Sequence, residues 1–445
     1  MKKIYEETIL FVSISKWFVL ASIIGAVVGG ATAGFLYLLN SSIVWFGQYK
    51  YYYFFLPIAL FFSALITLIA PEAKGHGTEK VIEAVHRRSG HIKAVVVPVK
   101  LLTTIITLAA GGSVGKEGPC AQIGGGLASI FADIFRFNDS DRKKLVICGI
   151  SAGFASVFGT PIAGAIFGIE ALFVGNFMYD VLLPSFVAGT MGYQVSSTLG
   201  ITYFYHVLDF VPSFSELFFA KVLLGGIFFG ICSLMLIECL KYFERLAKKI
   251  NIWTPFKGLI GGLILVLLTF VFSTQYLGLG LGAIENTLEG QHVVWWAFAA
   301  KILFTSITLS FAGSGGIVTP IFYIGATFGS LYASLMGLDP ATFAAIGMVS
   351  LLAGAANTPI AASILAVELF GPKVAPYAAV SCVACFFMTG HRSVYPSQIL
   401  AFMKSSSLQG DIGKEIEDVH TEFLVRQRSV SSLVQYYGRK IIKKL

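Results

Sequence analysis

The stretch GGSVGKEGP (residues 111–119) places a lysine and a glutamate between glycines inside an otherwise apolar region. A carboxylate at membrane depth is costly to bury, and such a residue most often belongs to a functional site. Gly115 and Gly118 allow the backbone to leave helical geometry and approach a ligand closely, and Pro119 suits the first turn of a new helix. The stretch therefore predicts a helix break whose free N–H groups form an anion site beside the ionisable Glu117.

Two other interpretations of this stretch were weighed. In the first, Glu117 pairs with Lys116 as a buried structural strut. Charged residues within a membrane more often have a functional role than a purely structural one. In the second, Glu117 acts with Ser113 in an intramembrane hydrolase, which needs a placed general base or a metal. The sequence has no H-E-x-x-H motif, no second catalytic carboxylate near Glu117 and no nucleophile elbow. We therefore expect a protein that is not an enzyme and that uses no cofactor and no metal.

The composition excludes a soluble protein. Of the 445 residues 56% are hydrophobic and 13% are charged, and the mean hydropathy is +0.78. Apolar runs long enough to cross a bilayer recur along the chain, which predicts an all-α polytopic membrane protein. The first run begins near Lys16 and is too long and too rich in glycine for a cleaved signal peptide.

The basic residues are unevenly placed. The formal net charge is +8, and only Lys221 is basic between Lys144 and Lys241. Lysine and arginine gather at residues 2–3, 74–100, 136–144 and 241–257 and in the C-terminal tail. The positive-inside rule puts these clusters and both termini in the cytoplasm. We therefore expect a multi-pass protein of the plasma membrane and no binding of nucleic acid.

The chain divides into four parts by pattern: a short cytoplasmic amphipathic lead at 1–15, a first transmembrane repeat at 16–212, a second at 213–403 and a basic cytoplasmic tail at 404–445. The expected helices lie at about 16–40, 52–70, 94–110, 119–135, 141–156, 161–174, 178–200, 214–245, 257–273, 293–311, 320–336, 340–355, 359–370 and 374–390. The stretch 393–402 predicts a final short helix, and the tail predicts a helix or partial disorder.

The two halves share a helix motif. TPIAGAIFGIEALF begins at Thr160 and TPIAASILAVELF begins at Thr358, so that Glu170 and Glu368 lie 198 residues apart. Because the carboxylate recurs in both halves, it favours a structural role. We predict paired or carbonyl-capping carboxylates in the bundle interior.

The two glycine breaks also align. GKEGPCAQIGGGLAS from Gly115 matches GIVTPIFYIGATFGS from Gly316 at five positions with an offset of 201. Interrupted hydrophobic segments at corresponding places in two halves indicate the midplane site of a transporter. The sequence therefore predicts two inverted-topology helical repeats whose broken helices meet at a midplane anion site.

These motifs resemble the CLC family of anion channels and anion/proton antiporters over about residues 16–402. GKEGP at 115–119, GIVTP at 316–320, TPIAGAIFGIEALF and Tyr395 match the family signatures in order. The resemblance implies a homodimer in which each subunit has its own anion pathway. It also implies that Glu117 is the external gate and proton carrier, and that the Tyr395 hydroxyl points at the bound anion from the inside.

Two signatures depart from the usual family pattern. The first break, usually GSGIP, here reads GHGTEK at residues 75–80, without the serine or the proline. The signature usually written GxFxP has Val318 in place of the aromatic residue, followed by Thr319. Both changes resemble the fluoride-exporting branch of the family, whose typical members have methionine where this chain has Thr78.

A third departure concerns protons. Proton-coupled chloride exchangers carry a second, internal glutamate after the position that matches Glu170, and here that place is Ala171. The loss indicates either a passive chloride pathway or another inner proton route, as in the fluoride branch. His76 is either a proton relay or a residue that faces the cytoplasm, and we favour the latter.

Fluoride is small and holds its hydration shell tightly, so its site must supply strong donors. Thr78, Thr319 and Tyr395 can supply them, although threonines in such places also cap helices or bond their own backbone. We expect Lys116 to neutralise local charge. The predicted anion-binding residues are Gly115, Gly118, Thr78, Ile317, Val318, Thr319 and Tyr395. The resulting hypothesis is a fluoride/proton antiporter that exports cytoplasmic fluoride, and the alternative is a CLC-type chloride channel or chloride/proton antiporter.

Overall fold

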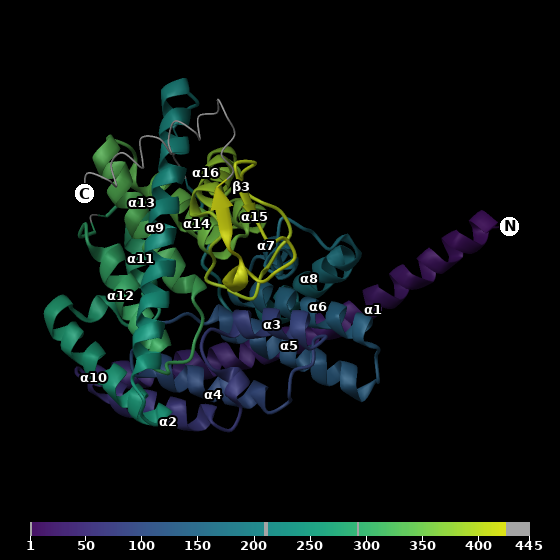
Figure 1. Cartoon of the computed structure of the whole chain (residues 1–445), viewed down its shortest axis with the longest axis horizontal. Helices are drawn as coiled ribbons and strands as arrows, with labels where there is room; N and C mark the ends of the chain where they lie inside the picture. The colour runs from purple at the N-terminus through teal and green to yellow at the C-terminus, as the bar shows by residue number, and fades with distance from the viewer. Residues whose placement is uncertain (1, 209–211, 292, 424–445) are drawn as a thin grey trace.

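The computed structural model describes residues 2–208, 212–291 and 293–423, which form a bundle of helices (Figure 1). The first eight helices are α1 (Lys2–Gly47), α2 (Leu56–Thr67), α3 (Gly77–Arg87), α4 (Val96–Ala109), α5 (Glu117–Ile134), α6 (Asp139–Phe158), α7 (Pro161–Glu170) and α8 (Leu182–Thr198). The next eight are α9 (Glu216–Lys249), α10 (Thr254–Phe272), α11 (Leu281–Leu288), α12 (Ala297–Ser310), α13 (Val318–Met336), α14 (Pro340–Ala356), α15 (Pro359–Phe370) and α16 (Ala375–Thr389). Short 3-10 turns lie at Tyr52–Phe55, Pro71–Ala73, Tyr179–Val181, Thr274–Tyr276 and Ile416–Asp418.

Four of the described helices are long and apolar enough to cross a membrane by length and composition: α1 from Tyr5 onward, α9, α10 and α13. Several shorter helices are also apolar, α4, α12 and α14 among them. α10 exposes large apolar side chains, with Leu267 66% and Val271 75% exposed. Surfaces of this kind suit lipid rather than water, and helices satisfy their own backbone groups there.

The two groups of eight helices pack in matching ways. α5 packs on α6 and α13 packs on α14, and the two groups meet where α7 contacts α15 and α5 contacts α13. α6 and α14 both begin at a side-chain cap, because Asn138 accepts from the Asp141 N–H at 2.8 Å and Asp339 accepts from the Thr342 N–H at 2.7 Å. Such caps satisfy amides that have no partner within the helix. The starts of α6 and α14 are thereby held in matching ways.

The final short helix expected at 393–402 is wrong. The chain there is extended, and β2 (Ile399–Leu400) pairs in parallel with β1 (Phe173–Val174). Pro396 disfavours helical geometry at Tyr395, the residue before it. The Ser393 hydroxyl accepts from the Tyr395 N–H at 2.9 Å, which holds this segment in its turn.

The N-terminal lead and the C-terminal tail also differ from expectation. α1 runs without a break from Lys2 because no glycine or proline interrupts residues 2–16. In the tail, β3 (Leu408–Gly410) pairs antiparallel with β4 (Thr421–Phe423), where we expected a helix or disorder. This segment lies in front of α14 and α15 in Figure 1. Residues 424–445 lie outside the described residues.

Two helices, α3 and α11, are absent from the expected ranges. α11 is a short helix in a stretch of the second half that the sequence left unassigned between 273 and 293. It follows the break that ends at Gly280, whose φ of 73° is a left-handed conformation that favours glycine. α11 contacts α13 and α14, and so covers one side of the second glycine break.

Candidate anion site

Three glycine breaks meet at the centre of the molecule. The Gly115 N–H donates to the Gly316 carbonyl at 2.7 Å, and the Gly316 N–H donates to the Gly115 carbonyl at 2.6 Å. A Cβ added to Gly118 would lie 2.9 Å from the Gly316 Cα and 3.3 Å from the Gly77 nitrogen. The starts of α3, α5 and α13 therefore touch backbone to backbone, which only glycine permits.

Glu117 is buried in this junction, with 1% of its surface exposed. The Thr319 N–H donates to its Oε1 at 3.0 Å, and the Thr319 hydroxyl donates to its Oε2 at 2.7 Å. Thr319 is the second residue of α13, so the carboxylate lies at the N-terminus of that helix. Helix N-termini present free N–H groups and a positive dipole end, and they bind anions. The glutamate thus occupies the kind of position that an anion takes.

This arrangement corrects one detail of the prediction. The donors to Glu117 come from the second half of the chain, because α5 itself begins at Glu117. The strut interpretation has no support, since no ion pair joins Lys116 to Glu117 among the described residues, while Thr319 binds both carboxylate oxygens. Lys116 is the N-cap of α5. It also lines a cavity of about 450 Å³ that is shared with Thr319, Phe322 and the loop around Tyr203.

Tyr395 lies near His76 and Phe167. Its side chain is fully buried, and its hydroxyl has no hydrogen-bond partner among the described residues. Thr78 and Glu117 are among the polar groups that act on this hydroxyl, and the His76 ring lies 5.8 Å from the tyrosine ring. A buried hydroxyl without a partner calls for a water or a ligand. Tyr395 therefore places a buried hydroxyl near the start of α3.

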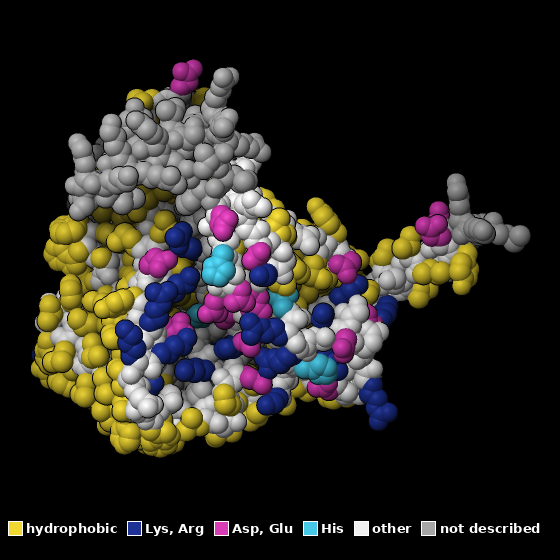
Figure 2. Space-filling model, viewed as in Figure 1, with side chains coloured by type: hydrophobic (Ala, Val, Ile, Leu, Met, Phe, Trp, Pro, Cys, Tyr) yellow, Lys and Arg dark blue, Asp and Glu magenta, His cyan; other side chains and the backbone are white. Residues whose placement is uncertain are grey.

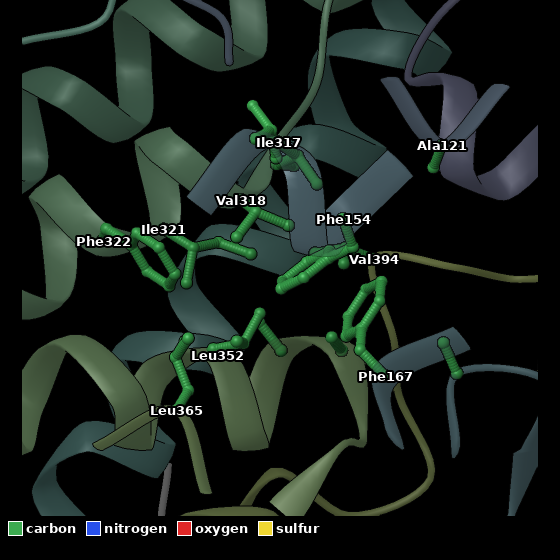
Figure 3. Close-up of a cluster of buried hydrophobic side chains, with 14 of the residues drawn as sticks. Ala121, Phe154, Phe167, Ile317, Val318, Ile321, Phe322, Leu352, Leu365 and Val394 are labelled. Carbon is green, nitrogen blue, oxygen red and sulfur yellow. The ribbon is translucent and has the colours of Figure 1, made fainter. Parts of the chain in front are cut away.

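The other predicted residues divide into two groups. Ile317 and Val318 are buried, and Figure 3 shows their side chains in an apolar cluster with Ile321 and Phe154. Both residues lie at the start of α13, where Ile317 is the N-cap. Gly115 gives its N–H to Gly316, so that amide is already satisfied. Its lack of a side chain matters more, because a Cβ there would overlap the Glu117 carboxylate.

Glu170 and Glu368 have a structural role, as expected, but with different partners. Glu170 accepts from the Ile360 and Ala361 N–H groups at 3.0 and 2.8 Å. Glu368 accepts from the Ile162 and Ala163 N–H groups at the same two distances. A carboxylate accepts hydrogen bonds, so the partners are amides at helix starts and not the carbonyls that the prediction named. Each half thus caps a helix of the other.

Sequence reasoning missed two groups beside the junction. Lys100 is fully buried and donates to the carbonyls of Ala73 and Gly75 at 3.2 and 2.5 Å, which fixes the first break. A lone lysine within VVVPVKLLTTI was the signal. Glu79, in the first turn of α3, is 8% exposed and bonded to Ser397. Its signal was an acid directly after a glycine break.

This fold of broken helices around a carboxylate and a buried tyrosine defines a class of membrane anion transporter. The profile of the voltage gated chloride channel family matches residues 58–390, and the chain belongs to that family. This is the CLC family that the motifs resemble, a family of transporters and not of enzymes, so the hydrolase interpretation is excluded.

Individual relatives agree with this assignment. The chain is 34% identical over 406 residues to the chloride/fluoride channel protein of Pseudomonas syringae pv. tomato, which covers 90% of each chain. The crystal structure of a CLC-type fluoride/proton antiporter superposes with a TM-score of 0.83 at 28% identity, over 87% of this chain and 98% of that one. A slow cyanobacterial Cl−/H+ antiporter matches in fold at a TM-score of 0.74 and 21% identity, over 84% of this chain and 94% of that one.

Proposed function

We propose that this protein is a fluoride/proton antiporter that exports cytoplasmic fluoride, with Glu117 as gate and proton carrier. The observation that carries the proposal is the bonding of the Glu117 carboxylate by the N–H and hydroxyl of Thr319. These donors suit any small anion, so the carboxylate and the transported anion compete for them. Competition of this kind links the occupancy of the site to the protonation of Glu117.

The linkage gives an exchange cycle. The ionised carboxylate holds the donors of Thr319 and excludes the anion. When Glu117 binds a proton it loses its charge, releases the donors and turns away, and an anion enters in its place. Return of the carboxylate expels the anion and frees the proton to the side that the carboxyl then faces. One group therefore carries protons in one direction and admits anions in the other.

Three hydroxyl groups support fluoride as the anion. Thr319, Thr78 and Tyr395 are buried beside the junction of the breaks, and the Tyr395 hydroxyl lacks a partner among the described residues. An ion that holds water tightly is transferred only to strong donors. The two relatives whose names include fluoride add to this support. The proposed anion-binding set is Gly115, Gly118, Thr78, Ile317, Val318, Thr319 and Tyr395.

We also propose that residues 16–212 and 213–403 are inverted-topology repeats. Gly115 and Gly316, 201 positions apart, bond each other reciprocally and antiparallel. The Ser113 N–H donates to Thr308 and the Ser314 N–H donates to Thr107, both at 3.2 Å. Ser113 and Ser314 are 201 positions apart, and so are Thr107 and Thr308. A two-fold axis between the halves accounts for all of these bonds. A homodimer is proposed from the family resemblance, and chemical cross-linking in the membrane tests it.

The proposed orientation places both termini in the cytoplasm. Figure 2 shows lysine and arginine side chains gathered over one face, bordered by apolar surface on both sides. Arg87, Arg88 and Lys93 lie in one of the basic stretches and form ion pairs with acidic partners. The positive-inside rule assigns basic loops to the cytoplasmic side. Accessibility of a cysteine placed at Lys143 to an impermeant reagent from inside, and not from outside, is the expected result.

The second candidate is a chloride channel or chloride/proton antiporter. The observation in its favour is Ala171, which removes the internal glutamate of the exchangers and suits a passive pathway. The deciding experiment measures anion efflux from proteoliposomes that hold the full chain, with fluoride and with chloride, while a pH electrode records protons. We expect an outward fluoride gradient to drive protons inward and chloride to move more slowly. Chloride flux that is equal to or faster than fluoride flux would select the second candidate, and the proton record would then separate a channel from an antiporter.

A further inference from the structure

We propose that Glu79 is the inner proton-transfer residue, which carries protons between the cytoplasm and Glu117. The inference rests on the proposed antiport function. It concerns the transfer of protons on the inner side, because this chain has Ala171 where chloride/proton exchangers have a glutamate. No cofactor or covalent step is involved. A proton from water on the inner side binds Glu79, passes on to Glu117, and leaves Glu79 ionised again.

The first support is the burial and incomplete bonding of Glu79. The residue is 8% exposed, in the first turn of α3 next to the glycine break. Its Oε1 accepts from the Ser397 N–H at 3.1 Å and from the Ser397 hydroxyl at 2.5 Å. Its Oε2 is buried without a partner among the described residues. A purely structural carboxylate has both oxygens satisfied, as Glu170 does.

The second support is a group of other buried polar atoms that also lack partners in the described part of the chain. They are the Tyr395 hydroxyl, the His76 Nδ1 and the Gln122 Oε1. The Gln122 Oε1 lies 2.8 Å from where a Cβ on Gly77 would be, and Gly77 is two residues before Glu79. Buried polar atoms in such a group are commonly bridged by ordered water. Water held here gives a proton a route along the start of α3.

Tyr395 connects Glu79 to the gate. The Tyr395 side chain is fully buried, and its ring lies 5.8 Å from the ring of His76, the N-cap residue of α3. Ser397, which binds Glu79, is two residues after Tyr395 on the same extended segment. The buried Tyr395 hydroxyl thus lies on the segment that binds Glu79, and its ring lies near the start of α3. It can pass a proton by accepting one and donating its own.

The third support is the position of this loop against the tail. The Ile416 N–H donates to the Gln398 carbonyl at 2.8 Å, and the Glu417 N–H donates to the Pro396 carbonyl at 3.2 Å. The tail follows the last membrane helix and carries Glu415, which binds Arg87 at the far end of α3 through two hydrogen bonds. Glu79 therefore lies between the anion site and the side of the molecule that the tail covers.

The charges that face Glu79 are few. Lys80 and Glu83, bonded to each other at 2.7 Å, act on it from its own helix. The loop presents the hydroxyls of Ser397 and Tyr395, and α5 presents the neutral Gln122. The preceding 3-10 turn carries Glu72, which pairs with Arg88 at 2.8 Å. No cation among the described residues forms an ion pair with Glu79, so its carboxyl is free to exchange a proton.

The competing explanation is that Glu79 only anchors the loop of Tyr395. Glu79→Gln separates the two, because the glutamine oxygen still accepts from Ser397 but carries no proton. The measurement uses full-length protein in liposomes and records fluoride and proton fluxes together. We expect the proton-to-fluoride ratio to fall at least about tenfold in Glu79→Gln, while fluoride continues to move. Fluoride persists because Glu117 is still titrated from outside.

Two controls define the result. Glu83→Gln changes a carboxylate one turn further along α3, and Ser397→Ala removes a hydroxyl but leaves the Glu79 carboxyl. Both should keep the wild-type ratio. If Glu79→Gln does not reach the membrane, Glu79→Ala with Ser397→Ala removes both partners of the bond at lower cost, and it should be uncoupled in the same way. A wild-type ratio in a variant without the Glu79 carboxyl overturns the inference. Absence of proton movement in the wild type would instead overturn the antiport function.

Discussion

The two glycine breaks have the same backbone and different side chains. Gly115 and Gly316 bond each other reciprocally, yet the residue 201 positions after Glu117 is Val318. The break at Gly115 contributes an ionisable group, and the break at Gly316 contributes the donors of Thr319 that hold it. The backbone of the two breaks is therefore symmetric, whereas their side chains differ and make the two breaks inequivalent. An exchanger requires such a difference, since a proton carrier at both breaks would repel its own copy.

Glu170 and Glu368 are the contrasting case, because here the side chains are paired as well. Each accepts two N–H groups from the start of a helix in the other half, at matching distances. The hydrogen bonds match in the two halves, although Glu170 is buried and Glu368 only half-buried. The comparison separates the carboxylates that cap helices from the carboxylate that we propose carries protons.

The largest expected effect is on stability, and it tests the paired carboxylates. Glu170→Ala and Glu368→Ala each remove two hydrogen bonds to a charged acceptor, worth about 1.5–3 kcal/mol apiece. Both variants should unfold at lower temperature in detergent, by similar amounts. Glu289→Ala, which alters an exposed residue of the second half, is the control and should be unchanged. A lower unfolding temperature in only one of the two variants would show that the two glutamates do not stabilise the protein equally.

The next effect is on anion affinity, and it tests the donors. Tyr395→Phe and Thr78→Ala each remove a hydroxyl beside the site and keep the surrounding packing. A hydrogen bond to a charged group is worth about 1.5–3 kcal/mol, or roughly tenfold and upward in affinity. Calorimetry should therefore detect weaker fluoride binding in each variant. Thr327→Ala, whose hydroxyl bonds the Tyr323 carbonyl at 2.8 Å on α13, is a matched control away from the junction. Unchanged binding in both test variants would remove these hydroxyls from the site.

The smallest expected effect is on selectivity. Val318 and Thr78 stand where this chain leaves the chloride-type pattern, so Val318→Phe with Thr78→Ser restores part of that pattern. We expect the ratio of chloride to fluoride transport to rise roughly fivefold, which corresponds to about 1 kcal/mol. The added ring must fit among the apolar side chains of Figure 3, such as Ile321 and Leu352, which limits the gain. A variant that folds and transports with the parent's ratio would place selectivity at other residues.

The sequence predicted the helices, the breaks and the carboxylate well, and its failures have physical causes. The pattern of apolar residues and glycines located α5 and α13. That pattern could not reveal that the donors to Glu117 come from Thr319 in the other half of the chain. The extended segment around Tyr395 was mistaken for a helix because its neighbours in space, Leu172 and Val174, are far away in sequence. Glu79 was overlooked for the same reason, since only its contact with Ser397 distinguishes it from an exposed acid.

The central claim is that Glu117 alone gives the two similar breaks opposite roles, by carrying protons and excluding the anion. Glu117→Gln keeps the shape of the side chain but cannot carry a proton. The direct measurement is proton uptake driven by a fluoride gradient in liposomes that hold this variant, beside the wild type. The account predicts that fluoride-driven proton movement is lost in the variant and present in the wild type. Coupled transport that persists in Glu117→Gln at the wild-type rate would contradict it.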